Sequence, residues 1–511
     1  MAVRMPRLLP ILTVTVVLAV PGPTQSHTSQ SSALWGASGQ SYRKEGPLAD
    51  FSWAGYHAGG DLPSARPIAN VLDFGVRGDG KSDDTAAFQR AIDEAATGVL
   101  LVPRGRYRLA GQLNIRRSGL VLRGEGTGAE GTILQFSSSL ADLQGLVALP
   151  ETNKLSWSGG LIQVAPKGSE HSLTSVTQIA RRGERRLRVA DAKSIHSGDV
   201  LVLRLSEDSE RSLEQHLLGE PDPKRTIAAP LLSTCAARIL DWTFQVDSVD
   251  GDEVVISQPL RTDVRLTWAP KVWQVPFLHD VGIEHLVIDF PSTPYPGHHR
   301  ERGYNAIDLS QNVVDAWVRD VEIRNCDSGL FVGRRSKWIT VTALRFISSR
   351  PADPEGNQGH HGVALSGCSE VLVTDLNFGA EFVHEMTVTH RAMGNVFSGP
   401  VKGGVLDIDH HRDAPFENLF QNLSGNLHLQ DGGSKCYGPP SGARNTYWGV
   451  DGLTLPVWLG SGAVVVGDLA PNTKEARSPA AWIEAVPGLE PRDLRAAQWR
   501  RRQVQTKPNH R

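Results

Sequence analysis

The stretch NVLDFGVRGDGKSDDTAAFQRAIDEAATGVLLVPRGRYRL, residues 70–109, decides the fold of this chain of 511 residues. It contains a helix start near Thr85, because the carboxylate of Asp83 or Asp84 can accept hydrogen bonds from the free N–H groups of a first helical turn. The apolar side chains that follow have the i, i+3, i+4 and i+7 spacing of one helix face, at Phe88, Ala91, Ile92 and Ala95. The stretch therefore predicts a short amphipathic helix.

Strand signals follow the helix. Gly98 is expected to end the helix, and VLLVP at residues 99–103 is a short apolar run typical of a buried strand. GRYRL at residues 105–109 is expected to turn into a second strand. Glycine is abundant, with 51 residues, and few long helical patterns occur, which favours a turn-rich β protein.

FGVRGDGKSDDTAAFQRAID and VPRGRYRL resemble the N-terminal signature of the pectate lyase superfamily. The resemblance is to the branch that contains polygalacturonases, rhamnogalacturonases and tail-spike or epimerase-like proteins. It implies an all-β fold, a right-handed parallel β-helix whose N-terminal end is covered by a capping helix. This fold carries several activities, so the resemblance implies a carbohydrate substrate and leaves the reaction open.

The first residues have the pattern of a secretory signal peptide. Arg4 and Arg7 precede an apolar run at residues 8–20, and small and polar residues follow, so cleavage is expected near Ser26. The run is too short for a spanning helix, although an N-terminal membrane anchor is the alternative. We therefore expect a secreted or extracytoplasmic protein that has no membrane partner in its mature form.

The net charge bears on the binding partner, and the cysteine spacing bears on zinc binding and disulfides. The formal net charge of −2 argues against a nucleic-acid partner, and the oligomeric state stays open. The four cysteines lack zinc-site spacing, and they can form disulfides or remain buried thiols; they are Cys235, Cys326, Cys368 and Cys436.

Changes in pattern along the chain predict its organisation. Residues 185–205 and 242–260 alternate apolar and polar side chains around Gly-Asp turns, which is typical of antiparallel hairpins. The predicted parts are a signal peptide (1–26), an N-terminal strap (27–65), the capping helix with the first coils (66–150), an inserted β subdomain (151–275), the main coils with a groove (276–450), and a C-terminal cap with a basic tail (451–511).

A repeat runs through the main coils. Residues at the same place in successive coils form a column. The first column is an apolar residue with two more at +3 and +5, and it begins in successive coils at Ile283, Val318, Val341 and Val373. A second apolar column begins at Ile307, Leu330, Val363 and Met386. Coils of roughly 23 residues, two of them lengthened by insertions of roughly ten, explain both columns and indicate a solenoid. Each coil supplies short strands to parallel sheets.

The repeat places the candidate site residues. Insertions after Ile288 and Phe346 leave the same edge of the solenoid and can wall one groove. His361 and His384 each lie two residues before the second column, so we predict that they occupy consecutive coils about 4.8 Å apart. If Leu406 and Ile408 form the next strand of that column, the neighbouring acidic residues point outward and His410 lies beneath His390; these acidic residues are Asp407 and Asp409.

Histidine, aspartate and arginine thus gather on adjacent coils. The candidate catalytic residues are His360, His361, His384, His390, Asp407, Asp409, His410 and Arg412. The candidate substrate-binding residues are His298, His299, Arg300, Arg334, Arg335, Trp338, Arg391 and His411. Histidine can transfer protons near neutral pH, and arginine suits carboxylates.

Three functions fit these residues. The first is β-elimination, or a related C5 proton abstraction, on an acidic polysaccharide, with Arg or Ca²⁺ as the cation; no cofactor is otherwise indicated, and no protein metal site is predicted. The second is glycoside hydrolysis by Asp carboxyls, although the NTD, DD and GHG motifs of polygalacturonases are not reproduced as a set and GHHG at residues 359–362 is a loose match. The third is a noncatalytic polysaccharide-binding surface protein. We expect a polysaccharide lyase or glycoside hydrolase.

Overall fold

A computed structural model describes residues 30–150, 152–219, 232–235, 238–451, 453, 459–469 and 480–506. The predicted signal peptide and the last residues of the predicted basic tail lie outside these ranges. Within the described ranges, no helix has the length and apolar composition needed to cross a bilayer.

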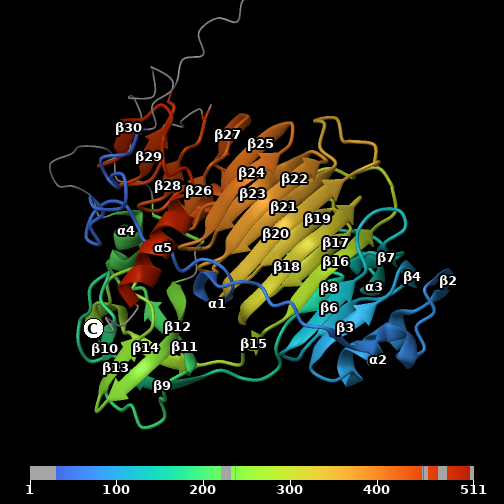
Figure 1. Ribbon diagram of the computed structural model, residues 1–511, viewed down its shortest axis with the longest axis horizontal. Coiled ribbons are helices and arrows are strands. Elements are labelled where there is room, and N and C mark those ends of the chain that lie inside the picture. The colour runs from blue at the N-terminus through green and yellow to red at the C-terminus, as the bar shows by residue number, and fades with distance from the viewer. Residues whose placement is uncertain are drawn as a thin grey trace, which may run out of the picture.

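Two parallel sheets form the main body (Figure 1). The larger described sheet consists of β1 (Pro67–Asn70), β2 (Asp79–Asp83), β3 (Gly98–Val102), β4 (Gly105–Leu109), β6 (Leu120–Gly124), β7 (Thr132–Phe136), β15 (Leu278–His279), β16 (Gly282–Asp289), β18 (Val313–Arg324), β20 (Lys337–Ile347), β22 (Leu372–Gly379), β24 (Val396–Lys402), β26 (Leu419–Gln421), β28 (Thr446–Trp448), β29 (Val464–Gly467) and β30 (Trp482–Ala485). The second sheet consists of β5 (Leu113–Ile115), β8 (Ile162–Val164), β17 (Asn305–Leu309), β19 (Ser328–Val332), β21 (Gly359–Ser366), β23 (Phe382–Thr389), β25 (Val405–His410) and β27 (Asn426–Gln430). The chain passes from one sheet to the other coil after coil, as a right-handed parallel β-helix does.

The strand register confirms both predicted columns. In the larger sheet, Val318 pairs with Ile283 on one side and with Val341 on the other, and Val341 pairs with Val373. The second sheet aligns the other column, whose successive partners are Ile307, Leu330, Val363 and Met386. These side chains are buried in one continuous apolar core between the sheets, because alternate residues of each strand point inward.

A smaller antiparallel sheet lies beside the C-terminal coils (Figure 1). Its strands are β9 (His171–Ser175), β10 (Arg186–Arg188), β11 (Val200–Ser206), β12 (Ile239–Asp250), β13 (Glu253–Ile256) and β14 (Lys271–Gln274). It has its own apolar core, which Met393, Ala414 and Phe416 of the β-helix join. The inserted segment is therefore packed against the coils.

The helices are short. They are α1 (Tyr56–Gly59), α2 (Thr85–Glu94), α3 (Leu140–Leu143), α4 (Ser212–Leu218) and α5 (Leu494–Thr506), with 3-10 turns η1 (Val71–Phe74), η2 (Lys154–Ser156), η3 (Leu266–Trp268) and η4 (Lys435–Tyr437). Helix α2 buries Phe88, Ala91 and Ile92 at the N-terminal end of the stack (Figure 1). It ends at Glu94, whereas Gly98, the predicted helix end, opens strand β3.

Buried ion pairs attach the antiparallel sheet to the coils. Arg261 Nε donates to Glu370 Oε1 at 2.6 Å, and the Nζ of Lys337 donates to the other oxygen of the same carboxylate. Arg261 also pairs with Glu417 at 3.3 Å. All of these side chains are almost completely buried. A buried charge without a partner is strongly destabilising, so these pairs keep the inserted segment against the β-helix.

Glu370→Gln is expected to lower the free energy of unfolding by about 3–5 kcal/mol, because it leaves Lys337 and Arg261 without their shared counter-charge. The matched control is Glu253→Gln, which breaks the more exposed pair with Arg186 in the same antiparallel sheet. That variant should change stability by no more than about 1 kcal/mol. Urea denaturation of both variants measures the difference, and equal effects would contradict this account of docking.

Candidate functional site

Two long loops meet at one edge of the second sheet. The backbone N–H of Tyr295 donates to the carbonyl of Pro351 at 3.0 Å, and Arg350 Nε donates to the carbonyl of Thr293 at 2.9 Å. Residues 291–304 and 348–358 therefore form the shared wall that their positions in the repeat predicted. His298 and His299 lie on the first of these loops.

The structure confirms the predicted placement of His361 and His384. They are direct partners in strands β21 and β23, and Ser328 of β19 precedes them in the same row. Their imidazole rings stack with centroids 5.0 Å apart. Adjacent coils thus bring into contact two histidines that are 23 residues apart in the sequence.

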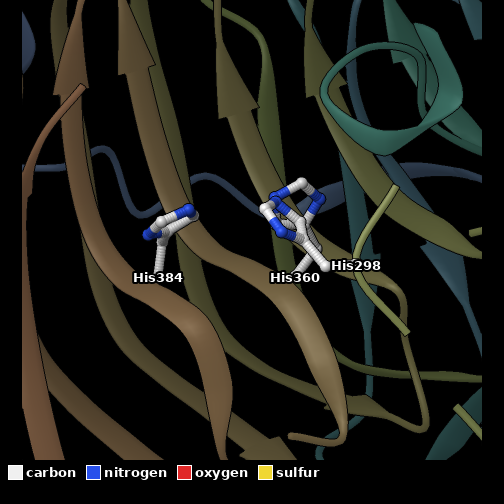
Figure 2. A group of neighbouring side chains, drawn as sticks. All are labelled: His298, His360 and His384. Atoms are coloured by element: carbon white, nitrogen blue, oxygen red, sulfur yellow. The ribbon is translucent and has the colours of Figure 1, made fainter. Parts of the chain in front are cut away.

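Loop and strand histidines join in one group, which we call the imidazole cluster. Its members are His298, His299, His360, His361, His384 and His411. The ring of His298 lies 4.5 Å from that of His360, and the ring of His411 lies 5.0 Å from that of His384, between centroids. Figure 2 shows His298, His360 and His384, whose rings gather above the strands.

Two buried carboxylates hold the cluster in place. Asp409 Oδ2 lies 2.7 Å from His411 Nδ1 and 3.4 Å from His384 Nδ1. Glu301 Oε1 lies 3.2 Å from His360 Nδ1. Burial by itself raises the pKa of both carboxyls, but their hydrogen bonds and the nearby histidines lower each pKa to about 2. Both carboxylates are therefore ionised at neutral pH.

Three imidazoles of the cluster, those of His298, His361 and His384, are neutral at the same pH. Partial loss of contact with water lowers the pKa of the exposed loop residue His298 to about 3. Burial lowers the pKa of His384 to about 4 and also lowers the pKa of His361. Neighbouring imidazoles add to this effect in all three cases, because adjacent positive charges repel. Neutral imidazole nitrogens can accept a proton or bind a metal ion.

The predicted position of His410 is wrong. His410 pairs with Val388, two residues before His390, and Ile408 pairs with Met386. The side chain of His410 therefore points into the core, where its Nε2 lies 2.7 Å from the Tyr447 hydroxyl. Its burial lowers its pKa to about 4, and it is part of the packing between the sheets.

Two predicted site arginines are engaged in structural contacts. Arg391 is buried, and its Nε donates to Asp413 Oδ1 at 3.3 Å. Arg412 donates to the backbone carbonyls of Gly433 at 3.0 Å and Gly438 at 2.7 Å. These guanidinium groups therefore stabilise turns, and they do not lie free in the groove.

A second group of predicted residues lies at a separate cavity of about 210 Å³ between the antiparallel sheet and the coils. Its lining includes Arg334, His390, Arg391 and Asp413. Arg335 is buried nearby in an ion pair with Glu170. Trp338 is also buried, in strand β20 of the larger sheet. The structure thus separates these residues from the imidazole cluster. Arg300, by contrast, is exposed on the loop that carries His298 and His299.

Asp407 and Asp409 lie on the same face of β25, as their spacing predicted, but they have different partners. Asp407 Oδ1 lies 2.9 Å from His428 Nδ1, and its other oxygen accepts a hydrogen bond from Gln430. Gln430 Oε1 in turn lies 2.7 Å from His384 Nδ1. Sequence reasoning missed Gln430 and Glu301. Gln430 is the strand partner of Asp409 in the next coil, so extending the repeat by one coil would have found it.

Residues 68–194 match the family described as rhamnogalacturonase A/epimerase, pectate lyase-like. Over these residues, about a quarter of the chain, the sequence is similar to that family. The match confirms the resemblance seen in residues 70–109.

Curated relatives match over a short segment. Alginate lyase 7 of Azotobacter vinelandii is 53% identical over 45 residues, which are 8% of this chain and 5% of that protein. Mannuronan C5-epimerase AlgE3 of the same organism is 56% identical over 45 residues, or 8% of this chain and 2% of that protein. The match thus covers only a small part of either relative.

Solved structures match over more of the chain at low identity. The tailspike gp49 of Pseudomonas phage LKA1 has a TM-score of 0.47 and 14% identity, covering 78% of this chain and 70% of that chain. An exopolygalacturonase from Thermotoga maritima has a TM-score of 0.33 and 13% identity, covering 80% of this chain and 74% of that chain.

The buried imidazole of His410 is expected to make stability depend on pH. Its folded pKa of about 4 lies below the value of about 6.5 in an unfolded chain. As the pH falls from about 6.5 towards 4, the unfolded state binds a proton that the folded state does not, so stability falls. In His410→Gln this loss should shrink by on the order of 2–3 kcal/mol. Unfolding free energies at pH 7 and pH 4 measure it, and an unchanged slope would contradict the assignment.

Proposed function

We propose that this chain is an enzyme that abstracts the C5 proton of a uronate residue in an acidic polysaccharide, leading to β-elimination or epimerisation. The observation that carries the proposal is the imidazole cluster at an edge walled by two long loops, with its carboxylate-held His411. The names of the short-segment relatives support it, because one is an alginate lyase and the other a mannuronan C5-epimerase. Inverting C5 requires the C5–H bond to be broken and remade.

His411 is the proposed base. Its Nδ1 donates to Asp409 Oδ2 at 2.7 Å, so Nε2 carries the lone pair. The side chain is 26% exposed, whereas the neighbouring His361 and His384 are buried. An imidazole oriented by a buried carboxylate is a common arrangement for proton abstraction. Asp409 acts through His411 as a positioning residue.

The substrate carboxylate also needs a cation. Arg300 is exposed on the loop that carries His298 and His299, and its guanidinium can form paired hydrogen bonds with a uronate. The cation draws electron density from C5 and makes its proton more acidic. This gives Arg300 the role that Arg391 and Arg412 cannot fill, since both are engaged elsewhere.

Glycoside hydrolysis is the second candidate, and one observation favours it. Burial and the nearby Asp407 raise the pKa of Glu385 to about 8, so this carboxyl holds a proton at neutral pH, as a general acid must. Glu385 is buried, however, and accepts hydrogen bonds from the backbone N–H groups of Phe382 and Asp407. Asp409 is likewise bonded to the histidines. Proton transfer by imidazole is therefore better supported.

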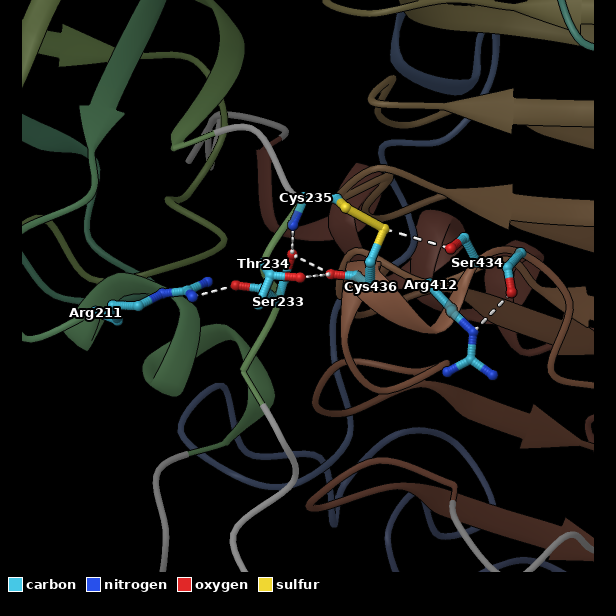
Figure 3. Close-up of a disulfide and its surroundings, with 8 residues drawn as sticks. Arg211, Ser233, Thr234, Cys235, Arg412, Ser434 and Cys436 are labelled. Carbon is cyan, nitrogen blue, oxygen red and sulfur yellow. Dashed lines mark hydrogen bonds between the residues drawn. A yellow bond between two sulfur atoms is a disulfide. The ribbon is translucent and has the colours of Figure 1, made fainter. Parts of the chain in front are cut away.

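We also propose that the protein works in an extracytoplasmic compartment. Cys235 and Cys436 form a disulfide between the inserted segment and the C-terminal coils (Figure 3). Disulfides persist mainly in oxidising compartments, which agrees with the predicted signal peptide. Cys326 and Cys368 are buried free thiols.

Incubation with a panel of acidic and neutral polysaccharides should separate the candidate functions. Elimination generates an unsaturated uronate, which is followed by its ultraviolet absorbance, and epimerisation exchanges the C5 proton with deuterium from D₂O. Reducing ends without either signal would replace this proposal by hydrolysis. Binding without any of the three would indicate a polysaccharide-binding protein.

His411→Ala is expected to lower turnover by about 10²–10⁴-fold, because the base is removed, while the thermal unfolding temperature changes little. The matched control is His285→Ala. His285 Nδ1 lies 2.8 Å from Asp320 Oδ2 and the side chain is 34% exposed, but it belongs to the larger sheet. Full activity in the His411 variant would refute its role as the base.

A further inference from the structure

We infer that His298, His360 and His384 form a binding site for a divalent transition-metal ion, with Zn²⁺ as the best fit. Each imidazole offers one nitrogen, and these nitrogens lie within 4.8 Å of one another. The three come from different parts of the chain, namely the loop after β16 and the strands β21 and β23 (Figure 2). The inference does not depend on the proposed reaction.

The distances suit a tetrahedral ion after a small movement. Zinc bound at 2.0–2.1 Å from each nitrogen needs N–N separations of about 3.4 Å. His360 and His384 are held by their strands, whereas His298 is exposed on a loop. Rotation of the His298 side chain can therefore bring its nitrogen closer to those of His360 and His384 without moving the coils.

Buried nitrogens without partners are the second observation. His360 Nε2 and His384 Nε2 are inaccessible to solvent and have no hydrogen-bond partner among the described residues. The side chains of His360 and His384 are 2% and 6% exposed. Burying an unpaired acceptor is unfavourable, and a bound ion would satisfy both nitrogens at once.

An oxygen atom lies beside the Nδ1 atom of each of the two buried histidines. Glu301 Oε1 lies 3.2 Å from His360 Nδ1, and Gln430 Oε1 lies 2.7 Å from His384 Nδ1. A proton on each Nδ1 leaves the lone pair on Nε2. Metal-binding histidines are commonly oriented in this way by a carboxylate or an amide oxygen on the other ring nitrogen.

The donor atoms select the kind of metal. Imidazole nitrogens suit Zn²⁺, Co²⁺, Ni²⁺ and Cu²⁺, whereas Ca²⁺ and Mg²⁺ require oxygen ligands. Calcium, the cation suggested by sequence, therefore does not match this site. Three histidines leave one coordination position open, as in catalytic zinc sites.

A second triad, His384 with Asp409 and His411, also has ligand atoms within 4.8 Å of one another. Its atoms already contact one another, since Asp409 Oδ2 lies 2.7 Å from His411 Nδ1 and 3.4 Å from His384 Nδ1. Asp409 therefore contacts His384 at Nδ1, and this second triad is not the site we propose. If the proposed reaction also holds, an ion held by the three histidines would lie near His411, whose ring is 5.0 Å from that of His384, and it could bind the carboxylate of a uronate.

Metal binding by the full chain, without any polysaccharide, tests the inference. Protein freed of metal by a chelator is titrated with ZnCl₂ in a calorimeter, and CoCl₂ is added to a second sample for visible spectroscopy. We expect one Zn²⁺ per chain with a Kd below about 1 µM, a rise in the thermal unfolding temperature, and the strong visible bands of tetrahedral Co²⁺. CaCl₂ should produce neither heat nor stabilisation.

Variants then locate the ion. His298→Ala removes an exposed loop side chain, so it should fold normally and bind Zn²⁺ at least 100-fold more weakly; His360→Ala should do the same. His411→Ala and His285→Ala should still bind one ion. Absence of saturable Zn²⁺ binding by the unaltered chain overturns the inference, and so does binding that His411→Ala abolishes while His298→Ala retains it. These readouts need no substrate, so their failure is distinct from failure of the proposed reaction.

Discussion

The parallel pairing of successive coils is the interaction on which the rest of the structure depends. Each strand is hydrogen-bonded to the strand of the coil before it and to that of the coil after it, so residues at the same place in the repeat become neighbours. This rule aligns apolar residues inside, where Phe346 stacks on Phe378 at 4.9 Å between centroids. On the outside it aligns His361 with His384. The same strand pairing therefore aligns both the inward side chains of the core and the outward side chains of the site.

The imidazole cluster shows how a solenoid can concentrate one kind of side chain. Histidines from the strands supply fixed positions, and the long loop adds His298 and His299 above them. Desolvation keeps His298 and His384 neutral, while Glu301 and Asp409 stay ionised through their contacts with histidines of the cluster. The result is a group of neutral imidazoles next to two carboxylates, which suits both proton abstraction and the binding of a divalent cation.

The inserted antiparallel segment is attached in two ways that a repeat does not provide. Its buried Arg261 reaches Glu370 and Glu417 on different coils. Its disulfide joins Cys235 to Cys436, which are 201 residues apart. Together these contacts bind one coil to the next from outside the β-helix. A cavity lined by Arg334 and His390 lies between the inserted segment and the coils, away from the imidazole cluster.

By itself, the sequence determined the solenoid, its capping helix α2 and the neighbouring positions of His361 and His384. It could do so because an apolar period reports directly which residues share a column. It misplaced His410 by two residues, since a shift of two along a strand keeps the same side chains inward and outward and leaves the apolar pattern unchanged. Only the tertiary structure brought His298 and Glu301 to the strands, because loop conformation follows from contacts such as that of Tyr295 with Pro351 and not from the repeat. The tertiary structure also decided which arginines are engaged in turns, because their partners lie on other coils or in the inserted segment.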